Sequence, residues 1–300
     1  MPLITSNPVN IVSADYFKYS FIDHLALMGL VAVATIISSL LLVYFIFRKK
    51  IPKTYSTELA ENLTQGTQPI PRNLLKISIA TLVAVDVGYV IASLSRIPVS
   101  FVICSGAIFL IAVYWAALNK GYFTVAGAKG IKSLAKEINW DIVLFMLSIF
   151  IVVQGLEHIG LTDFMAQAFV SAGSLPSVLS ILAPSLMVTV GASFMNNWPM
   201  TILGLFSIKQ AALSTALGGQ ALTGLIFSNI IGNNLGPHFF PLGSLAILMW
   251  LETMKRKGVN ISLWSYLKVG AVLSIVEVAV ASLVLWFELT YLGFGLNLNL

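Results

Sequence analysis

The stretch "MVTVGASFMNNWPMTILGLFSI" (187–208) is apolar almost throughout, yet Asn196 and Asn197 stand side by side in it, two residues before Pro199. Buried side-chain amides need hydrogen-bond partners, and a proline interrupts a helix. A membrane tolerates such an interruption only where it is buried in protein or lines a wet cavity. The role of the two asparagines therefore depends on the segments that surround this stretch.

Composition places those residues in a bilayer. Hydrophobic residues make up 58% of the 300 and charged residues only 10%, whereas a soluble domain carries about 25% charged residues. Apolar runs of about 20 residues recur along the chain, each long enough to cross a membrane as a helix. The sequence predicts an all-α polytopic membrane protein of the cell membrane, with the lipid bilayer as its surroundings.

The net charge of +5 does not indicate nucleic-acid binding, because Lys and Arg fall in short loops between the apolar runs. That placement is the one expected of cytoplasmic loops. The single cysteine, Cys104, excludes an internal disulfide and a multi-thiolate metal site. We expect it to be a small buried core residue.

The charge pattern also predicts a topology. We expect spans at 24–47, 75–95, 97–118, 141–158 and 264–288. The loops 48–74 and 119–139 share one side because two spans separate them, and both carry Lys, so we expect both in the cytoplasm.

The basic cluster 255–257 joins them only if 176–208 enters and returns as a re-entrant hairpin and 215–254 crosses as one broken helix. The C-terminus then lies outside the cell.

Three segments combine apolar flanks with a polar centre broken by Gly or Pro. They are "LITSNPVNIVSAD" (3–15), "GASFMNNWPMT" (191–201) and "FSNIIGNNLGPHFFPLGSLAIL" (227–248). One proline or glycine in a membrane helix usually means only a kink. Interruptions that recur in corresponding places, with clustered amides, are typical of a transporter's binding site. They favour alternating access over a passive channel.

These three segments closely resemble the ArsB-type arsenite/antimonite efflux permeases of the ion transporter superfamily, and the resemblance covers essentially the whole chain. It implies an inverted-repeat fold in which each half has a re-entrant hairpin and a broken helix, with the substrate between the two hairpin tips. By this resemblance, 75–300 is a complete second repeat, 48–74 a cytoplasmic linker, and 1–47 the end of the first repeat (broken helix 3–20, span 24–47). Because family members are longer, we expect the first repeat to be incomplete and the 300-residue product to be inactive alone.

The solute that fits is small and uncharged. Arsenite at neutral pH is mainly the trihydroxide, which calls for amide and hydroxyl groups and not for a fixed charge. The candidate substrate-binding residues are Asn196, Asn197, Pro199, Thr201, Thr5, Ser6, Asn7, Asn10, Asn229, Asn233, Asn234, Gly243 and Ser244.

The alternatives are a sodium/proton antiporter or another anion or solute carrier of the same superfamily. A dicarboxylate carrier would be expected to place Arg or Lys near the site, and the broken segments contain none. Sodium could use the same asparagine and backbone oxygens. An intramembrane enzyme would need a His/Asp metal motif or a nucleophile with a base, and neither spacing occurs. No cofactor or metal is expected.

Export of a solute against its concentration gradient has to be coupled to a source of free energy, such as proton entry. Acids inside membrane spans are costly and functional by default, and histidine titrates near neutral pH. The candidate proton-coupling residues are Glu277, Asp86, Asp15 and His238. The resemblance also implies a cytoplasmic arsenical pump ATPase as an alternative driving partner, and a homo-oligomer is compatible with it.

Overall fold

The computed structural model describes residues 1–51, 54, 72–95, 97, 99–120, 130, 133, 135, 136, 138, 140–215 and 217–296. The chain divides into two compact units, one formed by Met1–Phe45 and Val143–Leu300, the other by Ile46–Ile142. The predicted loops 48–74 and 119–139 lie largely outside the described residues. Each unit is described by itself.

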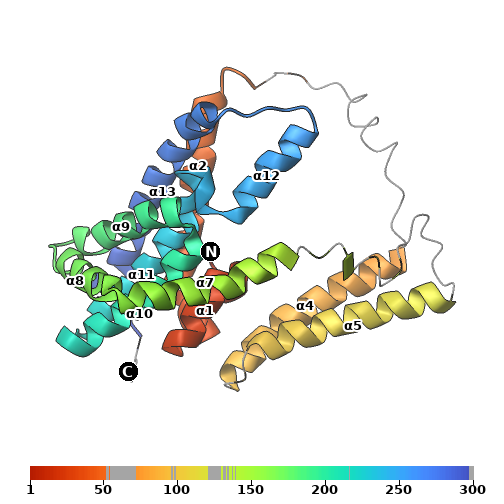
Figure 1. The fold of residues 1–300 in the computed structure, drawn as a ribbon, viewed down its shortest axis with the longest axis horizontal. Coiled ribbons are helices and arrows are strands. Elements are labelled where there is room, and N and C mark those ends of the chain that lie inside the picture. Colours follow the sequence, from red (N-terminus) through yellow and green to blue (C-terminus); the bar gives the residue numbers. More distant parts are fainter. Residues whose placement is uncertain are drawn as a thin grey trace. The chain divides into compact units, whose positions relative to one another are not determined.

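All elements of the described residues are helical (Figure 1). In the larger unit they are η1 (Ile4–Ser6), α1 (Pro8–Phe17), α2 (Phe21–Phe47), α7 (Trp140–His158), α8 (Leu161–Gly173), α9 (Leu179–Met195), α10 (Asn197–Thr215), α11 (Gly219–Leu235), η2 (Gly236–His238), η3 (Pro241–Gly243), α12 (Leu245–Arg256) and α13 (Leu263–Tyr291). The smaller unit contains α4 (Arg72–Leu94) and α5 (Val99–Lys120).

Four of these helices, α2, α4, α5 and α13, are long and apolar enough to cross a membrane. The pair α7 and α8 reaches that length and hydropathy together, but the two helices are bent by 80°. Gly160 stands at the bend with φ 77°, a conformation that favours glycine. The prediction of an all-α polytopic membrane protein is confirmed.

The expectation that Cys104 is buried is wrong, because its side chain is exposed on α5. In the smaller unit α4 and α5 pack through other positions of α5. A Cβ at Gly88 would stand 2.8 Å from Val102, and Gly106 packs against Val85. Cys104 is two residues from both Val102 and Gly106, and residues two apart do not share a helix face.

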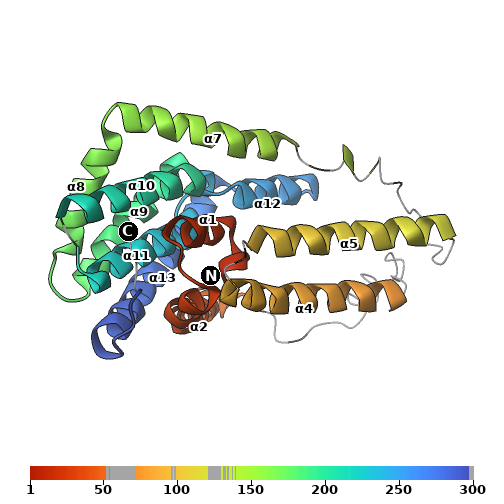
Figure 2. The ribbon, with the colours of Figure 1, turned by 90° about the horizontal axis from the view of Figure 1, so that it is seen from below.

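The larger unit is built around α9, α10 and α11, which lie side by side between α8 and α1 (Figure 2). The helices α9 and α10 meet at Asn196, whose backbone (φ 76°, ψ 150°) is in a region that L-residues rarely adopt. The two arms run from Leu179 to Thr215, so the second arm continues past the predicted end at 208. The segment 215–254, predicted as one broken helix, consists of α11, two 3-10 turns and α12. It begins at Gly219 and ends at Arg256.

Glycines allow α11 to approach α9 closely. A Cβ at Gly232 would stand 2.7 Å from the carbonyl oxygen of Ser185, and one at Gly236 would stand 2.9 Å from the Cα of Thr189. Ser193 Oγ then donates to the carbonyl of Gly236 at 3.1 Å. Small residues that bring backbones together are the usual device of helix association in membranes, where lipid supplies no hydrophobic driving force.

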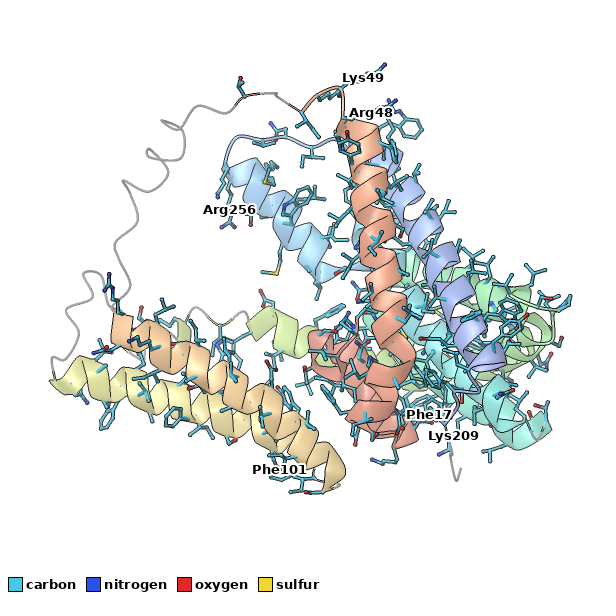
Figure 3. The ribbon with its side chains drawn as sticks, turned by 180° about the vertical axis from the view of Figure 1, so that it is seen from behind. Phe17, Arg48, Lys49, Phe101, Lys209 and Arg256 are labelled. Atoms are coloured by element: carbon cyan, nitrogen blue, oxygen red, sulfur yellow. The ribbon has the colours of Figure 1, made fainter. Side chains whose placement is uncertain are left out.

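The helix α10 also contacts α1. Lys209 Nζ lies 5.4 Å from the ring centroid of Tyr16, a cation–π contact. Lys209 and Phe17 are close together at one end of the larger unit, away from Arg256 at the end of α12 (Figure 3).

Two of the breaks have the same local geometry. In each, a 3-10 turn precedes one extended residue, and that residue caps the helix that follows. Asn7 (φ −151°, ψ 135°) accepts from the backbone N–H of Val9, and Ser244 (φ −147°, ψ 133°) accepts from that of Ala246. Each capped helix, α1 or α12, is followed by a long apolar helix, α2 or α13.

Candidate functional site

The helix α11 contacts the other two broken segments, and two adjacent asparagines of α11 take part in these contacts. Asn234 is hydrogen-bonded to side chains of the first segment, at the start of α1. The neighbouring Asn233 belongs to the contact with α10, the second arm of the hairpin. The bond from α10 reaches the backbone carbonyl of Asn233, while the Asn233 side chain bonds to Asn229 one turn earlier in α11.

On the α1 side, three amides form a chain of bonds. Asn7 Nδ2 donates to Asn234 Oδ1 at 3.0 Å, and Asn234 Nδ2 donates to Asn10 Oδ1 at 2.8 Å. Asn10 Nδ2 in turn lies 3.2 Å from the carbonyl of Leu3 and 3.3 Å from Ser6 Oγ. The predicted residues Ser6, Asn7, Asn10 and Asn234 are therefore together, and Thr5 lies half-buried in the same 3-10 turn.

On the α10 side, the amides are more deeply buried. Asn197 Nδ2 donates to the backbone carbonyl of Asn233 at 3.4 Å. Asn233 Nδ2 donates to Asn229 Oδ1 at 2.9 Å, and Asn229 Nδ2 donates to the carbonyl of Thr201 at 3.4 Å. Thr201 Oγ1 donates to the carbonyl of Asn197 at 2.6 Å, which closes the circuit.

One oxygen of this circuit has no donor. Asn233 is fully buried, and its Oδ1 has no hydrogen-bond partner among the described residues. An unsatisfied buried carbonyl costs roughly 1–3 kcal/mol. Such an atom is a candidate ligand for a bound hydroxyl or cation.

Asn196 joins the tip of the hairpin to the next break. Its Oδ1 accepts from the N–H of Trp198 at 3.2 Å, and its Nδ2 donates to the carbonyl of Leu242 at 3.3 Å. Leu242 is followed by Gly243 and Ser244, the last two predicted residues of that break. Pro199 is buried in the first turn of α10, where proline is tolerated because the N–H groups there have no helical acceptor.

The four proton-coupling candidates are not equivalent. His238 Nδ1 lies 2.8 Å from Glu277 Oε2, so these two form one pair. Asp15 is exposed and pairs with Lys18 at 2.9 Å. Asp86 is exposed on α4, in the smaller unit.

The sequence analysis did not select two residues that the structure places in these clusters. Ser39 donates to Glu277 Oε1 at 2.5 Å, and Gly204 packs directly against the amide of Asn229. The signal for Ser39 was the polar pair Ser38–Ser39 inside an otherwise apolar span. Gly204 gave no signal beyond being a glycine within a helix.

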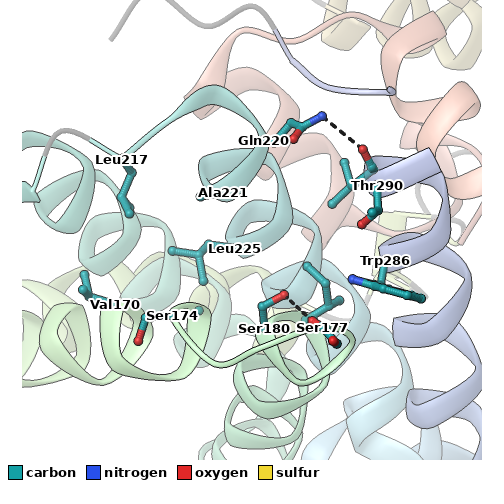
Figure 4. Close-up of a pocket in the computed structure, with 13 residues that line it drawn as sticks. Val170, Ser174, Ser177, Ser180, Leu217, Gln220, Ala221, Leu225, Trp286 and Thr290 are labelled. Carbon is teal, nitrogen blue, oxygen red and sulfur yellow. Dashed lines mark hydrogen bonds between the residues drawn. The ribbon is translucent and has the colours of Figure 1, made fainter. Parts of the chain in front are cut away.

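A separate cavity of about 350 Å³ lies between α8, α9, α11 and α13 (Figure 4). Its polar lining includes Ser174, Ser180, Gln220 and Trp286, and Gln220 Nε2 donates to the carbonyl of Leu289 at 3.1 Å. The cavity is near the first turns of α9 and α11, whereas the asparagines lie toward the end of α11. None of the predicted site residues lines it.

Within the described residues, no group of three or more His, Cys, Asp or Glu side chains could hold a metal ion.

Comparison with known proteins assigns the chain to a family. The model of the arsenical pump membrane proteins, ArsB, matches residues 1–289. An arsenical pump membrane protein of Escherichia coli is 33% identical over 292 residues, and one of Yersinia enterocolitica is 30% identical over 292 residues. Each match covers 97% of this chain but 65% of the relative, so the chain spans less than two thirds of the relatives' length. No solved structure matches it. The chain belongs to the ArsB family of arsenical pump membrane proteins.

Proposed function

We propose that this chain forms part of a membrane transporter that exports arsenite and antimonite, as neutral trihydroxides, from the cytoplasm. The observation that carries the proposal is that the first two broken segments both place asparagines against the third, which begins in α11 and continues through the break after it. Seven asparagines take part: Asn7, Asn10, Asn196, Asn197, Asn229, Asn233 and Asn234. Amides supply both donors and acceptors to a small trihydroxide without a fixed charge. The relatives' names, arsenical pump membrane protein, support this class of solute.

The shared geometry of the breaks at Asn7 and Ser244 supports the assignment of 1–47 and 75–300 to two related repeats. Repeats of this kind place the solute at their interface, near the middle of the bilayer. We place the cluster 255–257 and the loops 48–74 and 119–139 in the cytoplasm, and the C-terminus outside. The positive-inside rule supports this orientation.

For the driving force we propose proton entry, with a cytoplasmic ATPase subunit as the alternative. Glu277 and His238 are the stronger candidates because they contact each other beside a break and the side chain of Glu277 is buried. Asp15 and Asp86 are weaker candidates because both side chains are exposed. A second copy of the chain in a homo-oligomer stays part of the proposal.

A sodium/proton antiporter is the second candidate function, and Asn233 Oδ1 favours it. A buried oxygen without a donor is suited to a hard cation, which takes oxygen ligands from amides and backbone carbonyls. Such a site would use the same asparagines as the trihydroxide site. Ion tolerance therefore has to be measured beside metalloid tolerance.

The test uses a bacterial host that lacks its own arsenite exporter. The chain is expressed alone and fused to the part of the Escherichia coli relative that it does not cover. We expect the fusion to restore growth in arsenite and antimonite and to lower cellular arsenic.

The variant Asn233→Ala should abolish this protection, whereas Asn260→Ala, in the exposed loop before α13, should retain it. Unchanged arsenite tolerance with altered sodium tolerance would refute metalloid export and support the antiporter.

A further inference from the structure

A carboxylate lies in the middle of the apolar helix α13. Glu277 is 4% exposed and stands within "VLSIVEVAVASLVLWF". Acids inside membrane helices are rare, and they pair with other groups or mark the path of an ion. The groups that face Glu277 therefore decide what it does.

Both of its oxygens are bonded, and the donors come from two other elements. Oε2 lies 2.8 Å from Nδ1 of His238, in the 3-10 turn η2. Oε1 accepts from the hydroxyl of Ser39, in α2, at 2.5 Å. The His238 side chain is 44% exposed and that of Glu277 only 6%. The His238 ring is thus partly uncovered by the rest of the chain, whereas the carboxylate is enclosed by it.

The face of α13 that carries Glu277 also makes hydrogen bonds to the break after α11. Ser274 Oγ donates to the carbonyl of Leu235 at 3.0 Å, and Tyr266 Oη donates to that of Pro237 at 3.3 Å. Gly270 leaves room for the carbonyl of His238. Positions 266, 270, 274 and 277 recur every three or four residues and so form one helix face. The helix α13 thus donates to two backbone carbonyls of the break, those of Leu235 and Pro237.

Few other ionisable groups lie near the pair of Glu277 and His238. Tyr266, on the same helix, is within electrostatic range of Glu277. The helices α9 and α11, which pack on η2, carry no ionisable side chain, and α2 contributes the uncharged Ser39. Glu252 and Arg256 of α12 pair with each other at 3.2 Å and are exposed.

We propose that Glu277, His238 and Ser39 form a proton-binding site whose occupancy sets how firmly the break after α11 is held against α13. A proton from water adds to Nε2 of the neutral imidazole, and the resulting imidazolium pairs with the carboxylate through Nδ1–H. Release returns that proton to water and leaves a neutral imidazole, which still donates Nδ1–H but without the ionic attraction. Ser39 is a positioning residue that holds Oε1 of the carboxylate.

The proposal rests on the proposed function only in treating this break as part of the solute site. His238 follows Asn234 by four residues, so a change at the pair is one helical turn away in sequence from the amide cluster. Proton binding and solute binding would then be linked through one short segment.

The first test measures the protonation midpoint of His238 by NMR of labelled histidines in the purified chain in nanodiscs, without metalloid. The chain has three histidines, and His238→Asn identifies the signal. We expect Glu277→Gln to lower the midpoint by at least about one pH unit, a tenfold loss of proton affinity.

Ser39 is tested in the same way. Ser39→Ala should shift the midpoint in the same direction by less, because an unsatisfied Oε1 favours the neutral acid. Ser39→Thr should restore it. The matched control is Ser38→Ala, which loses only a bond to the carbonyl of Thr35 in its own helix and should leave the midpoint unchanged.

The second test asks whether the break responds. Spin labels at the exposed positions Met249 on α12 and Ile275 on α13, with Cys104→Ser to remove the native thiol, report their distance as pH is changed. We expect a longer or broader distribution above the midpoint, and a pH-independent one in Glu277→Gln.

An unchanged midpoint in Glu277→Gln would overturn the proposal, and so would an equal response to pH in that variant. Neither measurement uses metalloid. If the fusion fails to restore arsenite tolerance in the growth test, both measurements of the proton site remain valid.

Discussion

Gly204 lies where α10 packs against the amide of Asn229 in α11. A Cβ added there would collide with the amide of Asn229. That amide cannot simply rotate away, because its oxygen accepts from Asn233 at 2.9 Å and its nitrogen donates to the carbonyl of Thr201 at 3.4 Å. Gly204→Ala should therefore damage both the fold and the candidate site.

The magnitude follows from two terms. Forcing an extra carbon into a packed interior costs about 1–3 kcal/mol. A side-chain hydrogen bond in a membrane protein is worth about 0.6 kcal/mol on average, so losing the bond of Asn229 to Thr201 in α10 and its bond to Asn233 within α11 adds about 1 kcal/mol. We expect the free energy of unfolding to fall by about 2–4 kcal/mol.

The assay is reversible unfolding of the purified chain in mixed micelles, by denaturing-detergent titration or steric trapping. The matched control is Gly155→Ala in α7, where no atom of the described residues lies within 4 Å of the added Cβ. Alanine has the higher helix propensity, so this control should be neutral or stabilising by up to about 1 kcal/mol.

A double variant identifies the cause. In Gly204→Ala/Asn229→Ala the obstruction is gone, so the loss should be smaller than the sum of the single losses by about 1–2 kcal/mol. Wild-type stability in Gly204→Ala, or strictly additive losses, would refute the inferred contact.

Three further predictions follow from the same clusters. A double-mutant cycle on Asn7→Ala and Asn234→Ala should give a coupling energy of about 0.6–1.7 kcal/mol, and a value near zero would contradict their hydrogen bond. Asn196→Gly should be more stable than Asn196→Ala by about 1–3 kcal/mol, because both variants lose the side-chain hydrogen bonds of Asn196 but only glycine adopts φ 76° without strain; equal stabilities of the two variants would argue against strain. Gly232→Ala should cost more than Gly224→Ala, since the first meets a backbone carbonyl and the second the end of an isoleucine side chain; unfolding measurements that reverse this order would exclude the close approach of α11 to α9.

Several features were predictable because they depend on local pattern. Apolar runs set the spans, since each has to match the thickness of the bilayer. The break at Asn196 and the break after α11 followed from Asn, Gly and Pro within apolar stretches. Helix ends were less predictable. The second arm continues to Thr215 because nothing in the sequence before Gly218 stops it.

The sequence did not show which polar side chains bond to one another. The pairing of Asn234 with Asn7 and Asn10 joins residues more than 220 positions apart. The prediction for Cys104 failed for the same reason, since the packed face of α5 is determined by α4 and not by hydropathy.

The sequence by itself determined that the chain is a helical membrane protein with three polar breaks, because the energetic cost of polar groups in lipid is paid residue by residue. Only the tertiary structure decided that Asn234 bonds to Asn7 and Asn10, that Gly204 packs against Asn229, and that Ser39 bonds to the carboxylate paired with His238. Each of these depends on which helices meet and at what rotation, and that is fixed by side-chain packing and hydrogen bonds between distant parts of the chain.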